Sequence, residues 1–441
     1  MYLHGTSRIN DQGHLEIGGC DTVELAKQYG TPLFVYDEEF IREKCRSYIQ
    51  AFEKTEFSFQ VAYASKAFMS MAMCQLCEEE NLSLDVVSGG ELYTALKAGF
   101  PPQRIHFHGN NKTLEEMEMA MDANIGCFVV DNFYELEVLH ELAVKKEREV
   151  SILLRLTPGI EAHTHDYIST GQDDSKFGFT VSNGMALQGI KLALGKSNYR
   201  LLGIHSHIGS QIFETTGFVG AVQVLGEFLI NVRKETDYAV KVLNLGGGFG
   251  IRYTAEDDPL PAEQYISEIT AEVGRQFKTM DYPLPEIWIE PGRSIVGEAG
   301  TTLYRIGSIK EIPGIRTYVA VDGGMTDNIR PALYGSKYEV MLANRANAAK
   351  EQEVSIAGKC CESGDMLVWD VPIPKAESGD LLAVSCTGAY GYAMASNYNR
   401  IPRPAVVFVR DGASKLVIER ESYEDLVKND QMLKDLISYK R

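Results

Sequence analysis

The sequence predicts an α/β protein in which a (β/α)8 barrel of the TIM type, residues 37–304, is inserted into a β-rich domain built from residues 1–36 and 305–441. Two observations predict the barrel: eight short apolar runs occur between residues 59 and 290, and amphipathic segments separate them. Such alternation is typical of a parallel sheet buried on both faces, and eight units match the size of a barrel. After about residue 305, β-prone runs follow one another with few helices between them.

The elements of the predicted barrel can be placed in order. An apolar, β-prone run at residues 32–36 is followed by a helical pattern from Glu38 to Phe52. The eight runs expected to form the barrel are residues 59–64, 84–87, 104–108, 127–131, 151–156, 201–206, 241–245 and 286–290. Apolar residues between them recur at helical spacing, as in residues 90–97 and 133–139. A doubly wound sheet is the alternative, but no dinucleotide-binding fingerprint follows the first run.

The β-rich domain is predicted from the runs at residues 317–321, 354–357, 380–385, 405–410 and 415–420. We expect strands from the first 36 residues to complete it, in a Greek-key or β-sandwich-like arrangement. The barrel is then an insertion between two segments of one β domain.

Charge and composition narrow the classes of function. The formal net charge of -18 argues against a nucleic-acid partner and fits a cytoplasmic protein. No apolar run reaches transmembrane length, and the N-terminus lacks the pattern of a signal peptide. The 8 cysteines are scattered, which fits a reducing compartment. Cys74 and Cys77 form a single pair in a helical pattern, so core packing is favoured over structural zinc.

Polar residues and glycines gather at the predicted strand ends, where barrels of this kind carry their chemistry. They are Lys66, Asp85, Ser88, His106, His108, His205, His207, Ser210, Gly246, Gly247, Gly248, Glu290 and Arg293. The glycines follow the seventh run and Arg293 follows the eighth, the position at which such barrels bind phosphate. Glycines let backbone N–H groups approach an anion, and an arginine adds a bidentate fork. A tight turn without a ligand is the alternative.

Lys66 ends an apolar run, and burial would favour its neutral amine over the ammonium form. A neutral amine can form a Schiff base with a carbonyl compound, pyridoxal phosphate (PLP) above all. The alternative is a strand-end lysine that reaches solvent. Glu290 also ends an apolar strand and needs a partner, either a protonated pyridine nitrogen or Arg293. His207 could lie flat against a cofactor ring.

Two His-x-His pairs raise the question of a metal site. His205 and His207 share a face only if their strand continues, and His163 and His165 lie beside Asp166 in what we expect to be a polar active-site loop. No metal is predicted. The β-rich domain adds a second cluster, with two thiols and two carboxylates in residues 360–365, with Arg330 and Tyr334, and with Tyr390.

These motifs together resemble, in this order along the chain, the fold-type III PLP-dependent decarboxylases. The segments that carry the resemblance are residues 63–67, 205–211, 246–250, 290–293, 330–334, 361–365 and 388–390, and the resemblance covers essentially the whole chain. Ser206 is the one departure, since relatives often have cysteine there.

The resemblance implies a role for each matching residue. PLP would be attached to Lys66 and held by Asp85, His207, Ser210, Gly247, Gly248, Glu290, Gly292, Arg293 and Tyr390. Glu290 would hold the pyridine nitrogen, and His207 would stack on the ring. Cys361 would donate the proton that completes the reaction. The resemblance also implies a head-to-tail homodimer in which the segment around Cys361 completes the partner's site.

The implied substrate is meso-diaminopimelate, decarboxylated to L-lysine. Its binding residues would be Arg293, Arg330, Tyr334, Glu362 and Tyr390. Glu362 suits the distal ammonium of this substrate, and Arg330 with Tyr334 suits its distal carboxylate. Ornithine would leave the arginine unsatisfied. The alternatives are an ornithine or arginine decarboxylase, an alanine racemase of similar fold, and a non-catalytic PLP-binding regulator.

Overall fold

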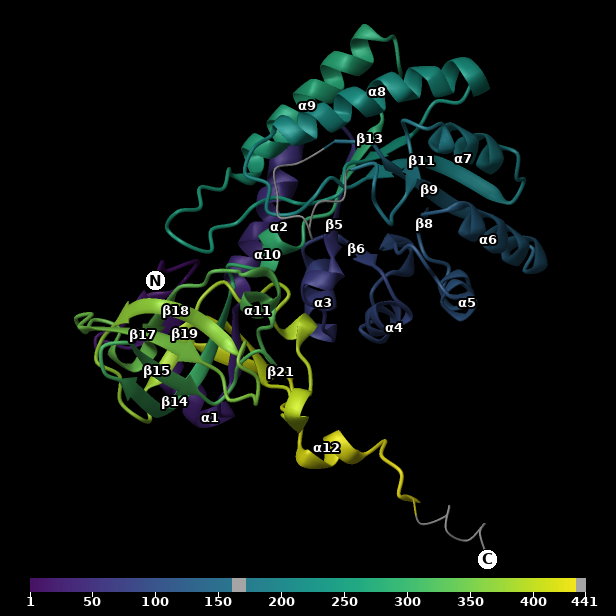
Figure 1. The fold of residues 1–441 in the computed structure, drawn as a ribbon. Coiled ribbons are helices and arrows are strands. Elements are labelled where there is room, and N and C mark those ends of the chain that lie inside the picture. Colours follow the sequence, from purple (N-terminus) through teal and green to yellow (C-terminus); the bar gives the residue numbers. More distant parts are fainter. Residues whose placement is uncertain (161–171, 434–441) are drawn as a thin grey trace, which may run out of the picture. The chain divides into compact units, whose positions relative to one another are not determined.

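The computed structural model describes residues 1–160 and 172–433, which fall into two compact units (Figure 1). The barrel unit comprises Glu39–Ala299 and Gly388–Ala393, and the β unit comprises Met1–Glu38, Gly300–Thr387 and Met394–Arg441. Tyr390 therefore lies in the barrel unit, although the sequence had placed it with the β-rich domain. The pair His163 and His165, with Asp166, lies outside the described residues.

Within the described residues, eight parallel strands close the barrel. They are β5 (Phe59–Ala64), β6 (Ser83–Val86), β7 (Ile105–Phe107), β8 (Cys127–Val130), β9 (Val150–Thr157), β11 (Tyr199–Ser206), β12 (Val242–Asn244) and β13 (Glu286–Ile289). The pairing of β13 with β5 closes the ring. The prediction of a barrel is confirmed, and every apolar run of the predicted barrel overlaps one strand. The sequence did not predict β10 (Phe179–Thr180), which pairs with the end of β9.

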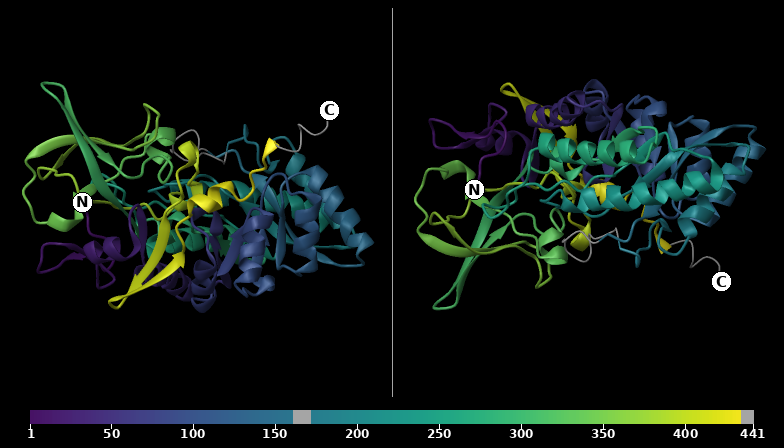
Figure 2. Two further views of the ribbon diagram at one scale, coloured as in Figure 1. Left: turned by 90° about the horizontal axis from the view of Figure 1, so that it is seen from below. Right: turned by 90° about the horizontal axis from the view of Figure 1, so that it is seen from above.

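Helices follow the strands and surround the sheet (Figure 1). They are α2 (Glu38–Glu53), α3 (Met71–Glu79), α4 (Gly89–Lys97), α5 (Leu114–Asp122), α6 (Phe133–Lys145), α7 (Met185–Leu194), α8 (Thr216–Thr236), α9 (Ala262–Thr279) and the short α10 (Arg293–Val296). Ser70, Ser88, Thr113 and Asn132 cap α3, α4, α5 and α6 by accepting a backbone N–H from the first turn. The four loops that these caps end, after β5, β6, β7 and β8, are therefore short. Figure 2 shows α8 and α9 side by side.

The β unit combines strands from both ends of the chain. Its main sheet has the order β18 (Met366–Ile373), β17 (Gln352–Ala357), β15 (Arg316–Val321), β14 (Gly300–Ile312), β4 (Leu33–Asp37), β20 (Ala405–Arg410) and β21 (Ala413–Ile418). Because β4 lies between β14 and β20, an N-terminal strand completes the C-terminal sheet, as predicted. The long β14 and β15 form a hairpin that is visible in Figure 2. The sequence did not predict β18.

Smaller elements complete the β unit. They are β1 (Arg8–Ile9), β2 (Leu15–Ile17), β3 (Cys20–Asp21), α1 (Thr22–Tyr29), α11 (Arg330–Tyr334), β16 (Val340–Leu342), β19 (Leu381–Val384) and α12 (Tyr423–Val427). The core joins the two ends of the chain, with Leu33 and Val35 packed in one cluster with Leu303 and Val407. In the described part of the chain, no helix has both the length and the apolar character needed to cross a membrane.

The close approach of β11 and β12 yields a test of the barrel. A Cβ added at Gly203 would lie 1.9 Å from the carbonyl oxygen of Val242. We expect Gly203→Ala to lower the free energy of unfolding by about 1–3 kcal/mol, measured by urea denaturation, because the strands must separate. Gly274→Ala in α9 is the control, since its Cβ would meet Phe57 at an ordinary 3.7 Å and alanine favours a helix. Equal midpoints for wild type and Gly203→Ala would contradict this packing.

Candidate functional site

Buried polar side chains are concentrated at the C-terminal ends of the barrel strands. Asp85, His106, His108, His205, Ser206, Asn244 and Glu290 are all buried and lie within the last residues of a strand or directly after it. Burying such groups is costly unless each is hydrogen-bonded or awaits a ligand. The contacts among them therefore show what this end of the barrel can do.

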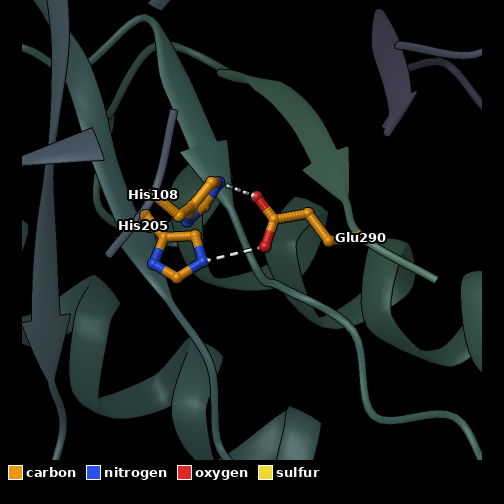
Figure 3. Close-up of side chains that lie close together, drawn as sticks. All are labelled: His108, His205 and Glu290. Atoms are coloured by element: carbon orange, nitrogen blue, oxygen red, sulfur yellow. Dashed lines mark hydrogen bonds and ion pairs between the residues drawn. The ribbon is translucent and has the colours of Figure 1, made fainter. Parts of the chain in front are cut away.

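Glu290 is the centre of this cluster (Figure 3). Its Oε2 lies 3.0 Å from His205 Nε2, and its Oε1 lies 2.9 Å from His108 Nε2. Asn244 Nδ2 donates a hydrogen bond of 2.7 Å to Oε1. Glu290 is therefore paired with histidines and an amide, and not with Arg293, the partner that the sequence offered as an alternative. His108 also lies 3.7 Å from Asp85 Oδ1.

The surroundings of Glu290 keep it ionised. Burial alone would raise its pKa, but the contacts with His108 and His205 outweigh burial and hold the pKa well below its usual range. Burial lowers the pKa of His205 to about 4, against the opposing effect of Glu290, so this ring is neutral at physiological pH. Because a carboxylate only accepts hydrogen bonds, His205 must carry its proton on Nε2. A neutral donor thus faces a buried anion.

Lys66 is exposed, so the expectation of a buried amine is wrong. Strand β5 ends at Ala64, and Lys66 lies in a single turn of 3-10 helix, Ser65–Ala67, at the barrel mouth. Its charge still acts on the cluster. Burial, and after it the charge of Lys66, lower the pKa of His207. Burial raises the pKa of Asp85, and Lys66 opposes that rise. Asp85 Oδ1 is buried without a hydrogen-bond partner.

The site also contains a buried cation, the guanidinium of Arg293. Arg293, in α10, donates to Ser210 Oγ at 2.9 Å from Nη2 and to the Tyr253 hydroxyl at 2.5 Å from Nη1. Its guanidinium carbon lies 4.9 Å from the centroid of the Tyr390 ring. No ion pair joins Arg293 to a carboxylate in the part of the chain that the structure describes. A buried guanidinium held by neutral groups is suited to an anionic ligand.

Glycines bring the turns after β11, β12 and β13 into contact. A Cβ at Gly247 would lie 2.0 Å from the Glu290 carbonyl oxygen, and one at Gly248 would lie 2.4 Å from that of Gly209. At Gly292, a Cβ would lie 2.9 Å from that of Ala64. The Gly247 N–H also points at His207 Nδ1, 3.3 Å away. Only residues without a Cβ allow these turns to converge.

These groups fit PLP. An ionised carboxylate suits a protonated pyridine nitrogen, the unneutralised guanidinium of Arg293 with Ser210 suits a phosphate, and Asp85 offers a buried oxygen that lacks a partner. Among the residues expected to bind the cofactor, all lie in the barrel unit: Lys66, Asp85, His207, Ser210, Gly247, Gly248, Glu290, Gly292, Arg293 and Tyr390.

A metal ion is the other ligand to consider. Among the described residues, one nitrogen each of His108 and His205 and one oxygen of Glu290 lie within 4.8 Å of one another. The carboxylate already accepts a hydrogen bond from His205 Nε2 at 3.0 Å and lies 2.9 Å from His108 Nε2, so both of its oxygens have partners. His207, which the sequence paired with His205, contacts Gly247 and is not part of this group.

The remaining predicted residues lie in the β unit. Arg330 begins α11 and is buried, with Nε donating to the Tyr338 hydroxyl at 3.0 Å and the guanidinium over the Tyr334 ring at 5.2 Å. Cys361 and Glu362 are exposed in the turn between β17 and β18. Cys361 is the one exposed thiol among all 8 cysteines.

The buried carboxylate of Asp365 links two segments of the β unit, one that precedes Arg330 and one that precedes Cys361. Asp365 accepts the N–H of Met325 at 2.6 Å and that of Cys360 at 2.8 Å. The Cys360 thiol is half-buried, and burial together with Asp365 raises its pKa to about 12. The thiol of Cys360 is therefore protonated and half-buried, whereas Cys361 is exposed to solvent.

Sequence reasoning missed two contributors. Asn244 interrupts an apolar strand as a single amide, and it had appeared only as part of that run. His108 had been noted only as a strand-end residue. The available signal for Asn244 was a polar residue inside an apolar strand. Its partner, Glu290, could not be found from local pattern, because it lies more than forty residues away in the chain.

The chain is similar to known proteins over nearly its whole length. The family model described as the pyridoxal binding domain of pyridoxal-dependent decarboxylases matches residues 38–297. Diaminopimelate decarboxylase of Bacillus methanolicus is 63% identical over 421 residues, covering 96% of this chain and 98% of that protein. That of Bacillus subtilis is 61% identical over 430 residues, covering 98% of both. The solved diaminopimelate decarboxylase from M. jannaschii with L-lysine is 37% identical, with a TM-score of 0.91 over 97% of this chain and 98% of that chain.

Proposed function

Because the chain belongs to the pyridoxal-dependent decarboxylase family, and is similar over nearly its whole length to diaminopimelate decarboxylases, we propose that it decarboxylates meso-2,6-diaminopimelate to L-lysine and CO2, the last step of lysine biosynthesis. The observation that carries the proposal is the barrel mouth itself. It combines an accessible lysine, a carboxylate held ionised by its contacts with His108 and His205, and a buried guanidinium without a carboxylate partner among the described residues.

Several polar groups at the barrel mouth are suited to holding PLP. Lys66 would hold the cofactor covalently, and Glu290 would keep its ring nitrogen protonated. Arg293, Ser210 and the backbone of the glycine turns would hold the phosphate. His207 would lie against the ring, and Asp85 and Tyr390 would complete the site. When bound, PLP supplies the electron sink that stabilises the charge left on Cα as CO2 departs.

The groups of the β unit are suited to the rest of the substrate. Arg330, fixed by Tyr338 and lying over Tyr334, matches a distal carboxylate, and Glu362 matches a distal ammonium. Ornithine and arginine lack that carboxylate, so they would desolvate Arg330 without compensation. Arg293 and Tyr390 would contact the substrate next to the cofactor. A charge pair of this kind selects a substrate that is zwitterionic at both ends.

Cys361 would deliver the proton to Cα after CO2 leaves, since its thiol is accessible while that of Cys360 is half-buried. We further propose that two chains form a homodimer in which the turn carrying Cys361 and Glu362 acts at the barrel mouth of the partner. The acidic net charge of -18 suits a cytoplasmic enzyme.

The substrate assignment is tested by a panel of meso-diaminopimelate, L-ornithine and L-arginine, with CO2 release and L-lysine formation as readouts. We expect turnover of diaminopimelate alone. Arg330→Met should lower kcat/KM for diaminopimelate about 10- to 100-fold, because a charge-assisted contact is lost. Arg316→Met is the matched control, since Arg316 pairs with Asp370 at the surface of the β unit. Faster turnover of ornithine than of diaminopimelate would contradict the assignment.

The proton-donor role is tested by Cys361→Ala. We expect kcat to fall by about 100-fold or more while PLP stays bound, because a positioned general acid is lost and no cofactor contact is touched. Cofactor retention is followed by its visible absorbance. Cys360→Ala, in the same turn, should keep the kcat of the wild type. Loss of PLP from Cys361→Ala, or equal slowing in both variants, would show that this thiol is not the donor.

A further inference from the structure

Asn244 uses both ends of its side chain to join two parts of the site. It is fully buried at the end of β12. Nδ2 donates to Glu290 Oε1 at 2.7 Å, and Oδ1 accepts the N–H of Gly246 at 2.9 Å. The main chain repeats the link, because the Glu290 N–H donates to the Gly246 carbonyl oxygen at 2.8 Å. The carboxylate and the glycine turn are therefore fixed relative to each other.

His205 controls the second oxygen of the same carboxylate. Its Nε2 lies 3.0 Å from Oε2, and its ring meets that of His108 edge-on, with centroids 4.9 Å apart and an interplanar angle of 73° (Figure 3). His205 Nδ1 is buried without a hydrogen-bond partner in the structure as described. The ring thus has one polar contact that orients it, and that contact is Glu290.

The choice of neutral donors has a physical consequence. An arginine or lysine at either position would also hold Glu290 in its ionised form, but it would cancel the negative charge. At these two positions, an amide and a neutral imidazole contact the oxygens without adding a positive charge. The carboxylate remains available to a cationic ligand group, at a fixed orientation and in a water-poor site where the interaction is strong.

We propose that Asn244 and His205 are positioning residues that orient the Glu290 carboxylate toward the protonated ring nitrogen of PLP, and that Asn244 couples this contact to the Gly246–Gly248 turn. The inference rests on the proposed function only in taking PLP as the cofactor. It assigns a role to two residues that touch Glu290 and that need not touch cofactor or substrate.

The test compares two ligands of the cofactor-free protein. One is PLP, and the other is its 1-deaza analogue, in which a C–H group replaces the ring nitrogen. The readout is the ratio of their dissociation constants, followed by absorbance and measured without turnover. We expect His205→Leu and Asn244→Leu to reduce the preference for PLP about tenfold or more, because a misoriented carboxylate loses its contact with the nitrogen.

Two polar variants of His205 test the preference for PLP over its analogue without placing an apolar group in the cluster. Glutamine places its amide nitrogen near the position of His Nε2, whereas asparagine places it near Nδ1. His205→Gln should therefore keep the preference for PLP, and His205→Asn should lose it. His106→Leu is the matched control, because His106 is equally buried in the same barrel but stacks on Trp288, with ring centroids 4.4 Å apart.

The outcomes separate the possibilities. Equal weakening of both ligands in His205→Asn and Asn244→Leu would mean a merely structural role and would overturn the proposal, as would an unchanged preference. A loss of preference in His106→Leu as large as in His205→Leu would also overturn it. A chain that prefers PLP in this way but releases no CO2 from diaminopimelate would instead contradict the proposed function.

Discussion

The burial of the Glu290 carboxylate is the constraint on which the rest of the site depends. An ion in the interior is costly, and contacts from His205, His108 and Asn244, at the ends of three other strands, offset this cost. A closed barrel makes this possible, because parallel strands deliver their C-terminal ends to one rim. Two of these contacts, those of Asn244 and of the neutral His205 ring, add no positive charge beside the anion.

The glycine turns impose the second constraint. Backbone from the ends of β11, β12 and β13 converges so closely that a Cβ at Gly247 would overlap the Glu290 carbonyl oxygen. This convergence places Arg293 beside Ser210 and brings Asn244 within reach of both Glu290 and Gly246. The carboxylate and the guanidinium are thus held by one connected piece of main chain.

Local pattern was enough to predict much of the architecture. Each apolar run of the barrel overlaps a strand, and β4 joins the C-terminal sheet, because burial on both faces leaves a continuous apolar signature. Strand order then brought Glu290 and Arg293 to one rim. The partners of Glu290 could not be predicted in this way: Asn244 looks like a single interruption of a strand, and its bond to Glu290 depends on tertiary packing. The exposure of Lys66 was also missed, because the strand ends before it.

The account is tested most directly by finding where PLP attaches. Borohydride reduces the carbon–nitrogen double bond between an amine and the cofactor aldehyde, and mass spectrometry of the digested protein then locates the labelled lysine. Lys112 is an internal reference, since its Nζ is buried and donates to Glu135 at 2.7 Å and to the carbonyl oxygens of Gly109 and Val129. The account predicts the label on Lys66 alone. A label on another lysine, or none in protein loaded with PLP, would contradict it.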